Sequence, residues 1–242
     1  MKHLKVFDTV ADFEAAKEQL ESPWVTFTED NEKVHYDKSE EPQPTYEHVD
    51  LGLPSGLKWA TMNVGATSET KGGLRFQWGD TVGYADTDTS HSTWSTQPFN
   101  NGSSSFDSDY FESHKSVWLN GDTLKPEYDA AHVHMGGNWR MPTNEEFEEL
   151  LENTNVSWIT LNGVNGFEFR SKTNGDNYIF IPTLYAMFSG RPIPNTMAYV
   201  WTSTLNIGSP NYAYELVINT NIHHVAASYL YNSYHIRGVL DA

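Results

Sequence analysis

Residues 49–61 read VDLGLPSGLKWAT, and residues 136–143 read GGNWRMPT. In both runs glycine and proline alternate with apolar side chains, a composition that fixes tight turns between short extended segments. Trp59 and Trp139 each contribute a large apolar ring system with a single hydrogen-bond donor, which suits them to hold irregular loops onto a core. We therefore expect the two runs, together with Trp78 and Trp201, to form a structural scaffold and not a binding site.

The second run leads into the one segment between residues 46 and 242 that the sequence clearly predicts to be a helix. Thr143 can cap its N-terminus, and Glu146 completes a capping box three residues later. Phe147 and Leu150 then share one apolar face with Leu151. Arg140, just before this helix, is expected to pair with a buried carboxylate. Elsewhere in this part of the chain, short strand-like runs alternate with turn residues.

The long polar stretch from Asp86 to Asp109 is predicted to be an extended surface loop. It is rich in Ser, Thr, Asn and Asp, and three aromatic residues, Trp94, Phe99 and Phe106, would hold it against the core.

The N-terminal part of the chain differs from the rest. Residues 1–36 are predicted to form a small module of one helix and a β-hairpin, with Asp8 or Thr9 as the helix cap and strands at 24–28 and 33–36. Residues 37–45 are acidic and contain two prolines, which is typical of a linker. The main domain is expected to span residues 46–242.

Composition excludes several classes of function. The net charge is −17, and the 15 Lys and Arg residues form no cluster, so a nucleic-acid partner is not expected. The absence of cysteine excludes disulfides, thiol catalysis and Cys-ligated zinc. The N-terminus has no apolar leader pattern, and no run approaches the roughly 20 apolar residues that span a bilayer. We expect no secretory signal and no membrane insertion.

Further runs continue the pattern in chain order: residues 63–66 (NVGA), 76–80 (FQWGD), 129–131 (DAA), 201–204 (WTST) and 236–239 (IRGV). Together with the two opening runs, they resemble a large family of paralogous proteins from gut Bacteroidales, including Bacteroides, and Fibrobacter. That family includes the variable proteins of diversity-generating retroelements, encoded by phage or host. The resemblance covers about residues 46–242. It implies an α+β, C-type-lectin-like fold with mixed short β-strands, few helices and long loops.

The chemistry found on this fold in other proteins is not matched here. C-type lectins that bind sugar through calcium use a Glu-Pro-Asn or Gln-Pro-Asp triplet and a Trp-Asn-Asp run. Here Ile193-Pro194-Asn195 has the Pro-Asn but lacks the acid, and no Trp-Asn-Asp run occurs. The formylglycine-generating enzymes that share the fold depend on cysteine. His132 and His134 would share one face of a strand, but no third zinc ligand is marked by spacing. We therefore expect no metal, no cofactor and no catalytic residues.

The segment 206–235 is the predicted variable segment. It is rich in Tyr, Asn and Ser, which adaptable binding loops use, and it contains no Lys, Arg or Asp. Leu216 and Ile218 are predicted to point inward from a strand with their neighbours facing out, and residues 225–233 are predicted to form a loop or irregular strand. The candidate ligand-binding residues are Tyr212, Tyr214, Asn221, His223, His224, Ser228, Tyr229, Tyr231, Asn232 and Tyr234.

The resemblance also implies a mechanism of variation. Such retroelements mutate adenines in asparagine AAC codons, which yields any residue type except Glu, Lys, Gln, Met and Trp. Those five types make up 46 of the 242 residues, but within 206–235 only Glu215 belongs to them. A β-rich, low-charge end of a core domain would also be poor in Lys and Glu, so this alternative stays open.

These observations favour a ligand-binding, receptor-binding protein with a hypervariable surface, located on a phage tail. Its partner would be a bacterial surface protein or glycan, and a homo-oligomer is possible. The alternative is a non-diversified adhesin or glycan-binding protein at the bacterial cell surface. An enzyme on the same fold is the third reading.

Overall fold

The computed structural model describes residues 46–85, 88–183, 187–188, 191–192 and 196–242, together with three strands nearer the N-terminus. By its internal contacts the chain divides into two compact units, Met1–Pro44 and Thr45–Ala242. None of the helices in these described residues is long and apolar enough to cross a membrane.

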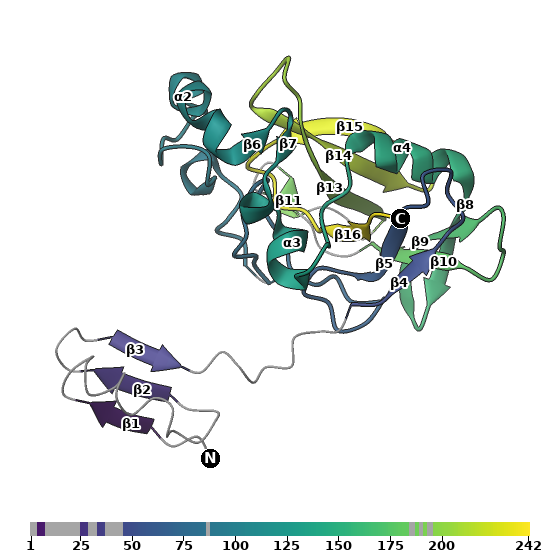
Figure 1. The fold of residues 1–242 in the computed structure, drawn as a ribbon, viewed down its shortest axis with the longest axis horizontal. Coiled ribbons are helices and arrows are strands. Elements are labelled where there is room, and N and C mark those ends of the chain that lie inside the picture. The colour runs from purple at the N-terminus through teal and green to yellow at the C-terminus, as the bar shows by residue number, and fades with distance from the viewer. Residues whose placement is uncertain are drawn as a thin grey trace. The chain divides into compact units, whose positions relative to one another are not determined.

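The first unit contains a three-stranded sheet in the order β1-β2-β3 (Figure 1). The strands β2 (Val25–Thr28) and β3 (Lys33–Tyr36) pair antiparallel at the two positions where the sequence predicts strands. A further strand, β1 (Leu4–Phe7), pairs parallel to β2 and was not predicted. The helix predicted between residues 8 and 20 lies outside the described residues.

A chain that begins at Thr45 is expected to fold as the second unit does in the full chain. The reason is that the boundary between the two compact units falls at Pro44, directly before this residue. Thermal melts of the second unit, followed by near-ultraviolet circular dichroism of its tryptophans, should match in the full and shortened chains. An insoluble shortened chain, or one without fixed tertiary packing, would show that the division is wrong.

The second unit is an α+β domain in which the strands pair antiparallel. A five-stranded sheet has the order β15-β14-β13-β7-β6, and three smaller sheets have the orders β16-β5-β4, β10-β9-β8 and β11-β12. The strands are β4 (His48–Asp50), β5 (Lys58–Asn63), β6 (Leu119–Asn120), β7 (Thr123–Leu124), β8 (Thr154–Leu161), β9 (Val164–Ser171), β10 (Tyr178–Pro182), β11 (Met187–Phe188), β12 (Arg191–Pro192), β13 (Met197–Leu205), β14 (Tyr212–Asn219), β15 (His223–Tyr229) and β16 (Arg237–Leu240).

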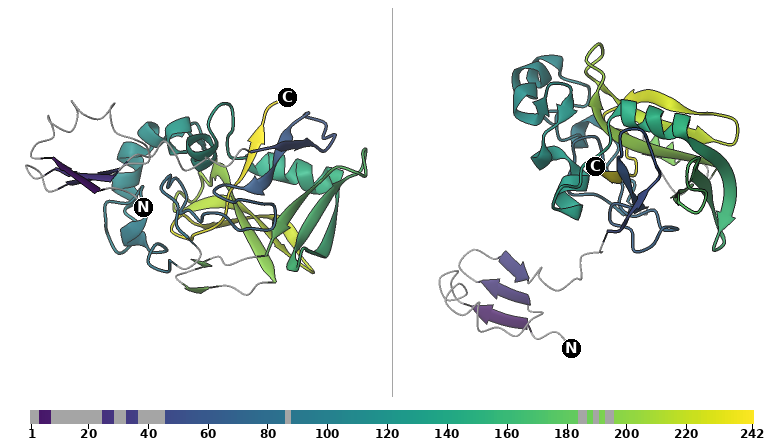
Figure 2. Two further views of the ribbon diagram at one scale, coloured as in Figure 1. Left: turned by 90° about the horizontal axis from the view of Figure 1, so that it is seen from below. Right: turned by 45° about the vertical axis from the view of Figure 1, so that its right-hand side comes forward.

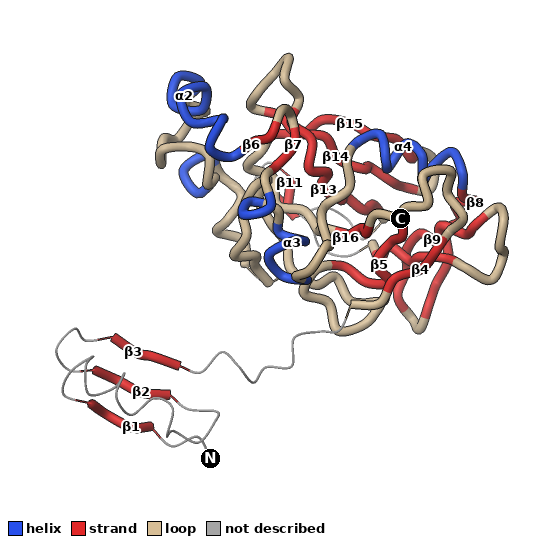
Figure 3. Tube along the Cα trace, in the orientation of Figure 1, coloured by secondary structure: helices blue, strands red, loops and turns tan. Residues whose placement is uncertain are grey.

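Three α-helices are present in the described residues, where the sequence clearly predicted one (Figure 3). The predicted helix is α4 (Asn144–Asn153), whose capping box between Thr143 and Glu146 is confirmed. The two others are α2 (Ser108–Trp118) and α3 (Ala130–Met135), capped by the side chains of Asp107 and Asp129. The described residues also contain two single 3₁₀ turns, η2 (Trp94–Thr96) and η3 (Pro126–Tyr128).

The central strands β13 and β14 of the five-stranded sheet are largely buried on both faces, and this burial decides which side chains of the C-terminal segment reach solvent. On one face Leu216 and Ile218 pack in a core cluster with Phe147 of α4. On the other face Val217 packs in a second cluster with Trp201. The prediction that Leu216 and Ile218 point inward is confirmed. The prediction that their neighbours face out is wrong, because the loop-rich part of the domain covers the second face (Figure 2).

The quoted tryptophans are structural, as predicted. Trp59, Trp78 and Trp201 are fully buried, and Trp139 is nearly so. Trp59 lies on β5, which pairs with β16, and so the beginning and the end of the domain are joined in one sheet. Gly79 shows why these runs need glycine: its φ is +80°, and a Cβ there would lie 2.2 Å from the ring of Phe99.

Candidate functional site

The β14–β15 hairpin separates the predicted site residues into two groups. Tyr212 pairs with Tyr229 at one end of the hairpin, and Ile218 pairs with His223 at the other. At about 3.4 Å per residue, the two ends are roughly 20 Å apart. The tyrosines and the hairpin-tip residues therefore do not form one compact site.

An aromatic cluster occupies the first end. We call it the aromatic surface and define it as Trp94, Phe106, Tyr212, Tyr229 and Tyr231. The ring centroids of Tyr212 and Tyr229 are 4.3 Å apart, and those of Tyr229 and Tyr231 are 5.3 Å apart and nearly parallel. Trp94 lies edge-on to Tyr231 at 4.9 Å and also contacts Phe106 at 5.2 Å. The three tyrosines are half-buried, and so part of each ring reaches solvent.

The backbone fixes this cluster from two distant parts of the chain. Leu230 is fully buried between Tyr229 and Tyr231, and its N–H donates to the carbonyl of Asn211. The side-chain amide of Gln77 donates to the carbonyl oxygens of Thr93 and Tyr231, at 3.0 and 3.1 Å. Gln77 thereby links the loop that carries Trp94 to the turn that carries Tyr231, so the aromatic rings are held in place before any ligand arrives.

The phenol of Tyr212, in the aromatic surface, is neutral at physiological pH. A hydrogen bond to the side chain of Tyr229, with desolvation, raises the pKa of Tyr212 to about 12. Such groups can donate and accept hydrogen bonds but do not act as bases near neutral pH. The arrangement offers ring area with neutral polar edges, which is the chemistry of recognition.

Three of the predicted site residues are not available to a ligand. Ser228, Asn232 and Tyr234 are buried, and Tyr234 packs its ring against Tyr199 and Trp201 at 4.9 and 4.6 Å. The sequence analysis placed Ser228 and Asn232 at the surface because it predicted a loop or irregular strand over residues 225–233. Instead, β15 is a regular strand up to Tyr229, and its even-numbered side chains at the aromatic end point into the core.

The remaining predicted residues lie at the surface to different degrees. Tyr214 is half-buried on β14, opposite Ala227. Asn221, His223 and His224 are exposed at the tip of the hairpin. The tip is a defined turn, in which the side-chain oxygen of Asn219 accepts from the N–H groups of Asn221 and Ile222 at 2.8 and 2.9 Å.

A buried carboxyl group lies within the same hairpin. Glu215 is 2% exposed, and the hydroxyl of Ser228 donates to its Oε1 at 2.6 Å. The Ser228 hydroxyl also lies 3.1 Å from the hydroxyl of Tyr234. The second carboxyl oxygen of Glu215, Oε2, has no hydrogen-bond partner among the described residues. Desolvation raises the pKa of Glu215 to about 8, and so this side chain holds a proton at neutral pH.

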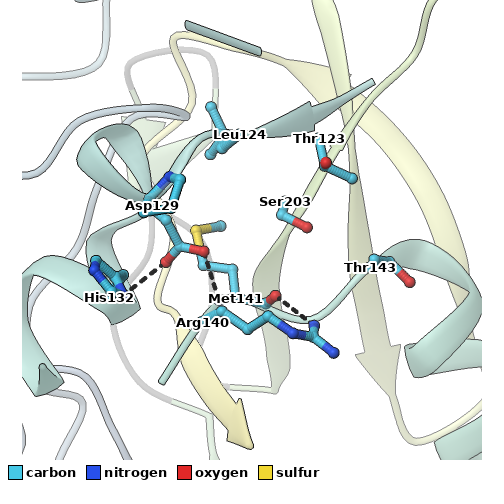
Figure 4. Close-up of a pocket in the computed structure, with 9 residues that line it drawn as sticks. Thr123, Leu124, Asp129, His132, Arg140, Met141, Thr143 and Ser203 are labelled. Atoms are coloured by element: carbon cyan, nitrogen blue, oxygen red, sulfur yellow. Dashed lines mark hydrogen bonds between the residues drawn. The ribbon is translucent and has the colours of Figure 1, made fainter. Parts of the chain in front are cut away.

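A separate pocket of about 220 Å³ lies between α3, β7 and the start of α4 (Figure 4). Its charged groups already have partners within the protein. Arg140 donates to both carboxylate oxygens of Glu146 at 2.6 and 2.8 Å and to Asp241 at 2.6 Å. Asp129 accepts from the N–H groups of His132 and Met141. The pocket is smaller than the roughly 300–1,000 Å³ of a typical small-molecule site, and we assign it a structural role.

The pairing of Arg140 with a carboxylate is confirmed, although Glu146 is only partly buried and Asp241 is exposed. The strand predicted for His132 and His134 is wrong, because both residues lie on α3. Their rings face different partners, the carbonyl of Trp139 for His132 and that of Thr81 for His134. The described residues contain no group of three or more His, Asp or Glu side chains that could hold a metal ion.

Sequence reasoning missed the part that Trp94 plays in this site. It assigned Trp94 only to holding the long loop, because nothing in the sequence shows that this loop meets the turn after β15. The available signal was the concentration of aromatic residues in both segments. Comparisons with protein-family models, curated proteins and solved structures found no match for this chain.

Proposed function

We propose that this chain is a ligand-binding protein that uses the aromatic surface to contact a bacterial surface protein or glycan. The observation that carries the proposal is the set of half-buried tyrosines held against Trp94 by a buried framework. Tyrosine and tryptophan supply large contact area at a low cost in conformational entropy, and they dominate binding hot spots. A framework that fixes the rings in advance lowers the ordering cost of binding further.

The scaffold is proposed to be C-type-lectin-like, and the protein to be a retroelement-diversified receptor-binding protein of a gut phage tail. Support for the scaffold comes from the sequence runs and from the α+β architecture of short strands, few helices and long connections. Support for diversification comes from the composition of residues 206–235. Neighbouring DNA provides the test. A reverse transcriptase gene and a near-copy of the 3′ coding end are expected, and their absence would contradict diversification.

One structural observation favours the alternative, a non-diversified cell-surface adhesin. Within residues 206–235, Ser228, Asn232 and Tyr234 are buried, and Ser228 and Tyr234 contact Glu215 or each other. Random replacement at such positions would damage the core, and so a diversified protein must confine its variation to the exposed and half-buried positions. Sequences of natural variants distinguish the two functions, because an adhesin would show no excess of change at Tyr212, Tyr229 and Tyr231.

Replacing Tyr231 by alanine is expected to weaken binding at least about tenfold, equivalent to roughly 1–2 kcal/mol for an anchor residue. Tyr231 contacts both Trp94 and Tyr229, and so its loss removes the middle of the aromatic surface. Binding can be measured on intact gut Bacteroidales cells and on their purified surface polysaccharides. The matched control is Tyr178→Ala, a half-buried tyrosine on β10 that packs against Arg170. Equal losses from the two variants would contradict this location of the site.

A further inference from the structure

The outer strand of the five-stranded sheet, β15, has one backbone edge that pairs with no other strand of the described residues. Among the described strands β15 pairs with β14 alone, and it forms the border of the sheet in Figures 1 and 2. Such an edge is a template on which another strand can pair. Proteins that stay monomeric usually protect it with charges, proline or a bulge. β15 has seven residues, HHVAASY, and contains none of these protective features.

The register of the hairpin shows which backbone groups point away from the sheet. The N–H of Asn219 donates to the carbonyl of Ile222, and the N–H of Leu230 donates to the carbonyl of Asn211. In an antiparallel pair the residues alternate between bonding the neighbour strand and facing away from it. The even-numbered residues of β15 therefore bond β14. The N–H and C=O groups of His223, Val225 and Ala227 point outward, and within the described part of the chain they bond no other backbone group.

Charge indicates what can approach this edge. The chain carries a net charge of −17, and so two copies repel each other over most of their surface. Between Glu215 and Arg237 the sequence contains no Asp, Glu, Lys or Arg, and Glu215 itself is buried. The edge of β15 is thus a strip along which two copies can meet without bringing like charges together.

The two ends of the strip also complement each other. Ile222, at the hairpin tip, is a large apolar side chain with 48% exposure. The other end carries the aromatic surface, with Tyr229 as the last residue of β15. If two β15 strands pair antiparallel about Ala226, Ile222 of each copy lies opposite Leu230 of the other, and His223 lies opposite Tyr229. The exposed apolar tip of one copy then meets the aromatic end of the other.

We propose that β15 is a dimerisation edge, on which a second copy of this chain pairs antiparallel about a two-fold axis at Ala226. The two five-stranded sheets then form one continuous ten-stranded sheet. This register brings all the outward groups of His223, Val225 and Ala227 into the new ladder, and small side chains at its centre allow close approach.

Single cysteines test the register, because the native chain has none. In the proposed pairing, Ala226 of the two copies are directly opposite as a pair without mutual hydrogen bonds, at a Cα–Cα distance of about 4.5 Å. That distance lies within the range for a disulfide. Ala226→Cys is therefore expected to form a covalent dimer under mild oxidation. Ala227→Cys is the matched control, since its copies would be offset by two residues and lie more than about 7 Å apart.

Sedimentation analysis of the native full chain at micromolar concentration is expected to give the mass of a dimer. Ala227→Pro removes one outward N–H without touching the β14 ladder, because proline is tolerated where the N–H faces away from the sheet. This variant is expected to be monomeric with unchanged circular dichroism. A monomeric native chain would overturn the proposal. If Ala227→Cys cross-linked as readily as Ala226→Cys, the proposed register would be wrong. If Ala227→Pro were still a dimer, the interface would lie elsewhere on the protein.

Discussion

Replacement of Trp201 by alanine is expected to lower the free energy of unfolding by about 3–5 kcal/mol, the cost of a large cavity at a buried aromatic side chain. Trp201 lies on β13 with no exposed surface, and its ring is 4.6 Å from that of Tyr234. Its Nε1 donates to the carbonyl of Phe76 at 2.9 Å. The side chain therefore joins the central sheet to the loop-rich half of the domain. Denaturant unfolding of the second unit measures the loss.

Two further variants test whether the loss of stability in Trp201→Ala comes from the removal of a buried side chain. Trp201→Phe keeps most of the ring volume, and the carbonyl of Phe76 retains the N–H of Tyr234 as a donor, so a smaller loss of about 1–3 kcal/mol is expected. Tyr231→Ala removes a half-buried ring from the aromatic surface and should cost on the order of 1 kcal/mol. If Tyr231→Ala destabilised the domain more than Trp201→Ala, the assignment of core and binding surface would be reversed.

The α+β class, the α4 capping box and the buried tryptophans could be predicted because each depends on a short local pattern. Thr143 and Glu146 are three residues apart, and the tryptophans stand among turn-forming glycines. The helices α2 and α3 could not be predicted in the same way. α2 is rich in Ser, Asp, Glu and Lys with only Phe111 and Trp118 buried, and α3 is six residues long. Their stability comes from packing and from aspartate caps, neither of which gives a periodic signal.

The candidate site was predicted only in part, because a strand pattern does not show whether both faces of its sheet are covered. Alternation of side chains along a strand shows which residues share a face, but not whether the second face is covered. Leu216 and Ile218 were correctly predicted to lie in a core, whereas the opposite face of their strand was expected to be exposed to solvent. Because the loop-rich part of the domain packs there, Tyr234 and Ser228 are buried. The contact between Trp94 and Tyr231 joins segments far apart in the sequence, and no local pattern encodes it.

Glu215 lies on the same covered face of the sheet. Its burial is expected to make the stability of the domain depend strongly on pH. Glu215 is ordinarily expected to lose its proton near pH 4.5, but desolvation raises its pKa to about 8 in the folded protein. Tyr199 and Tyr234 are the titratable groups near it, and neither is charged in this range because burial raises the pKa of both. No basic side chain contributes to the raised pKa of Glu215, and so within the described residues the buried carboxyl has no cation that stabilises its ionised form.

The sign of the effect follows from proton counting. Below pH 4.5 both the folded and the unfolded chains hold the Glu215 proton, and between pH 4.5 and 8 only the folded chain does. Stability from this group is therefore complete below pH 4.5, falls as pH rises and is lost above pH 8. Glu215→Gln replaces the carboxyl by a neutral group of the same shape, and so this variant does not lose this stability as pH rises. Its advantage over the native chain should be near zero at pH 4 and grow to about 3–5 kcal/mol at pH 8.

Denaturant unfolding of both proteins across pH 4–8 provides the measurement, since all other titrating groups cancel in the difference. Ser228→Ala is a useful companion variant. The hydroxyl of Ser228 donates to Glu215 and lowers its pKa, and so its removal should raise that pKa further and steepen the loss of stability toward high pH. A difference between Glu215→Gln and the native chain that stays constant with pH would mean that Glu215 is ionised in the fold. The carboxylate would then need a cation or ordered water near Oε2, the oxygen that has no hydrogen-bond partner among the described residues.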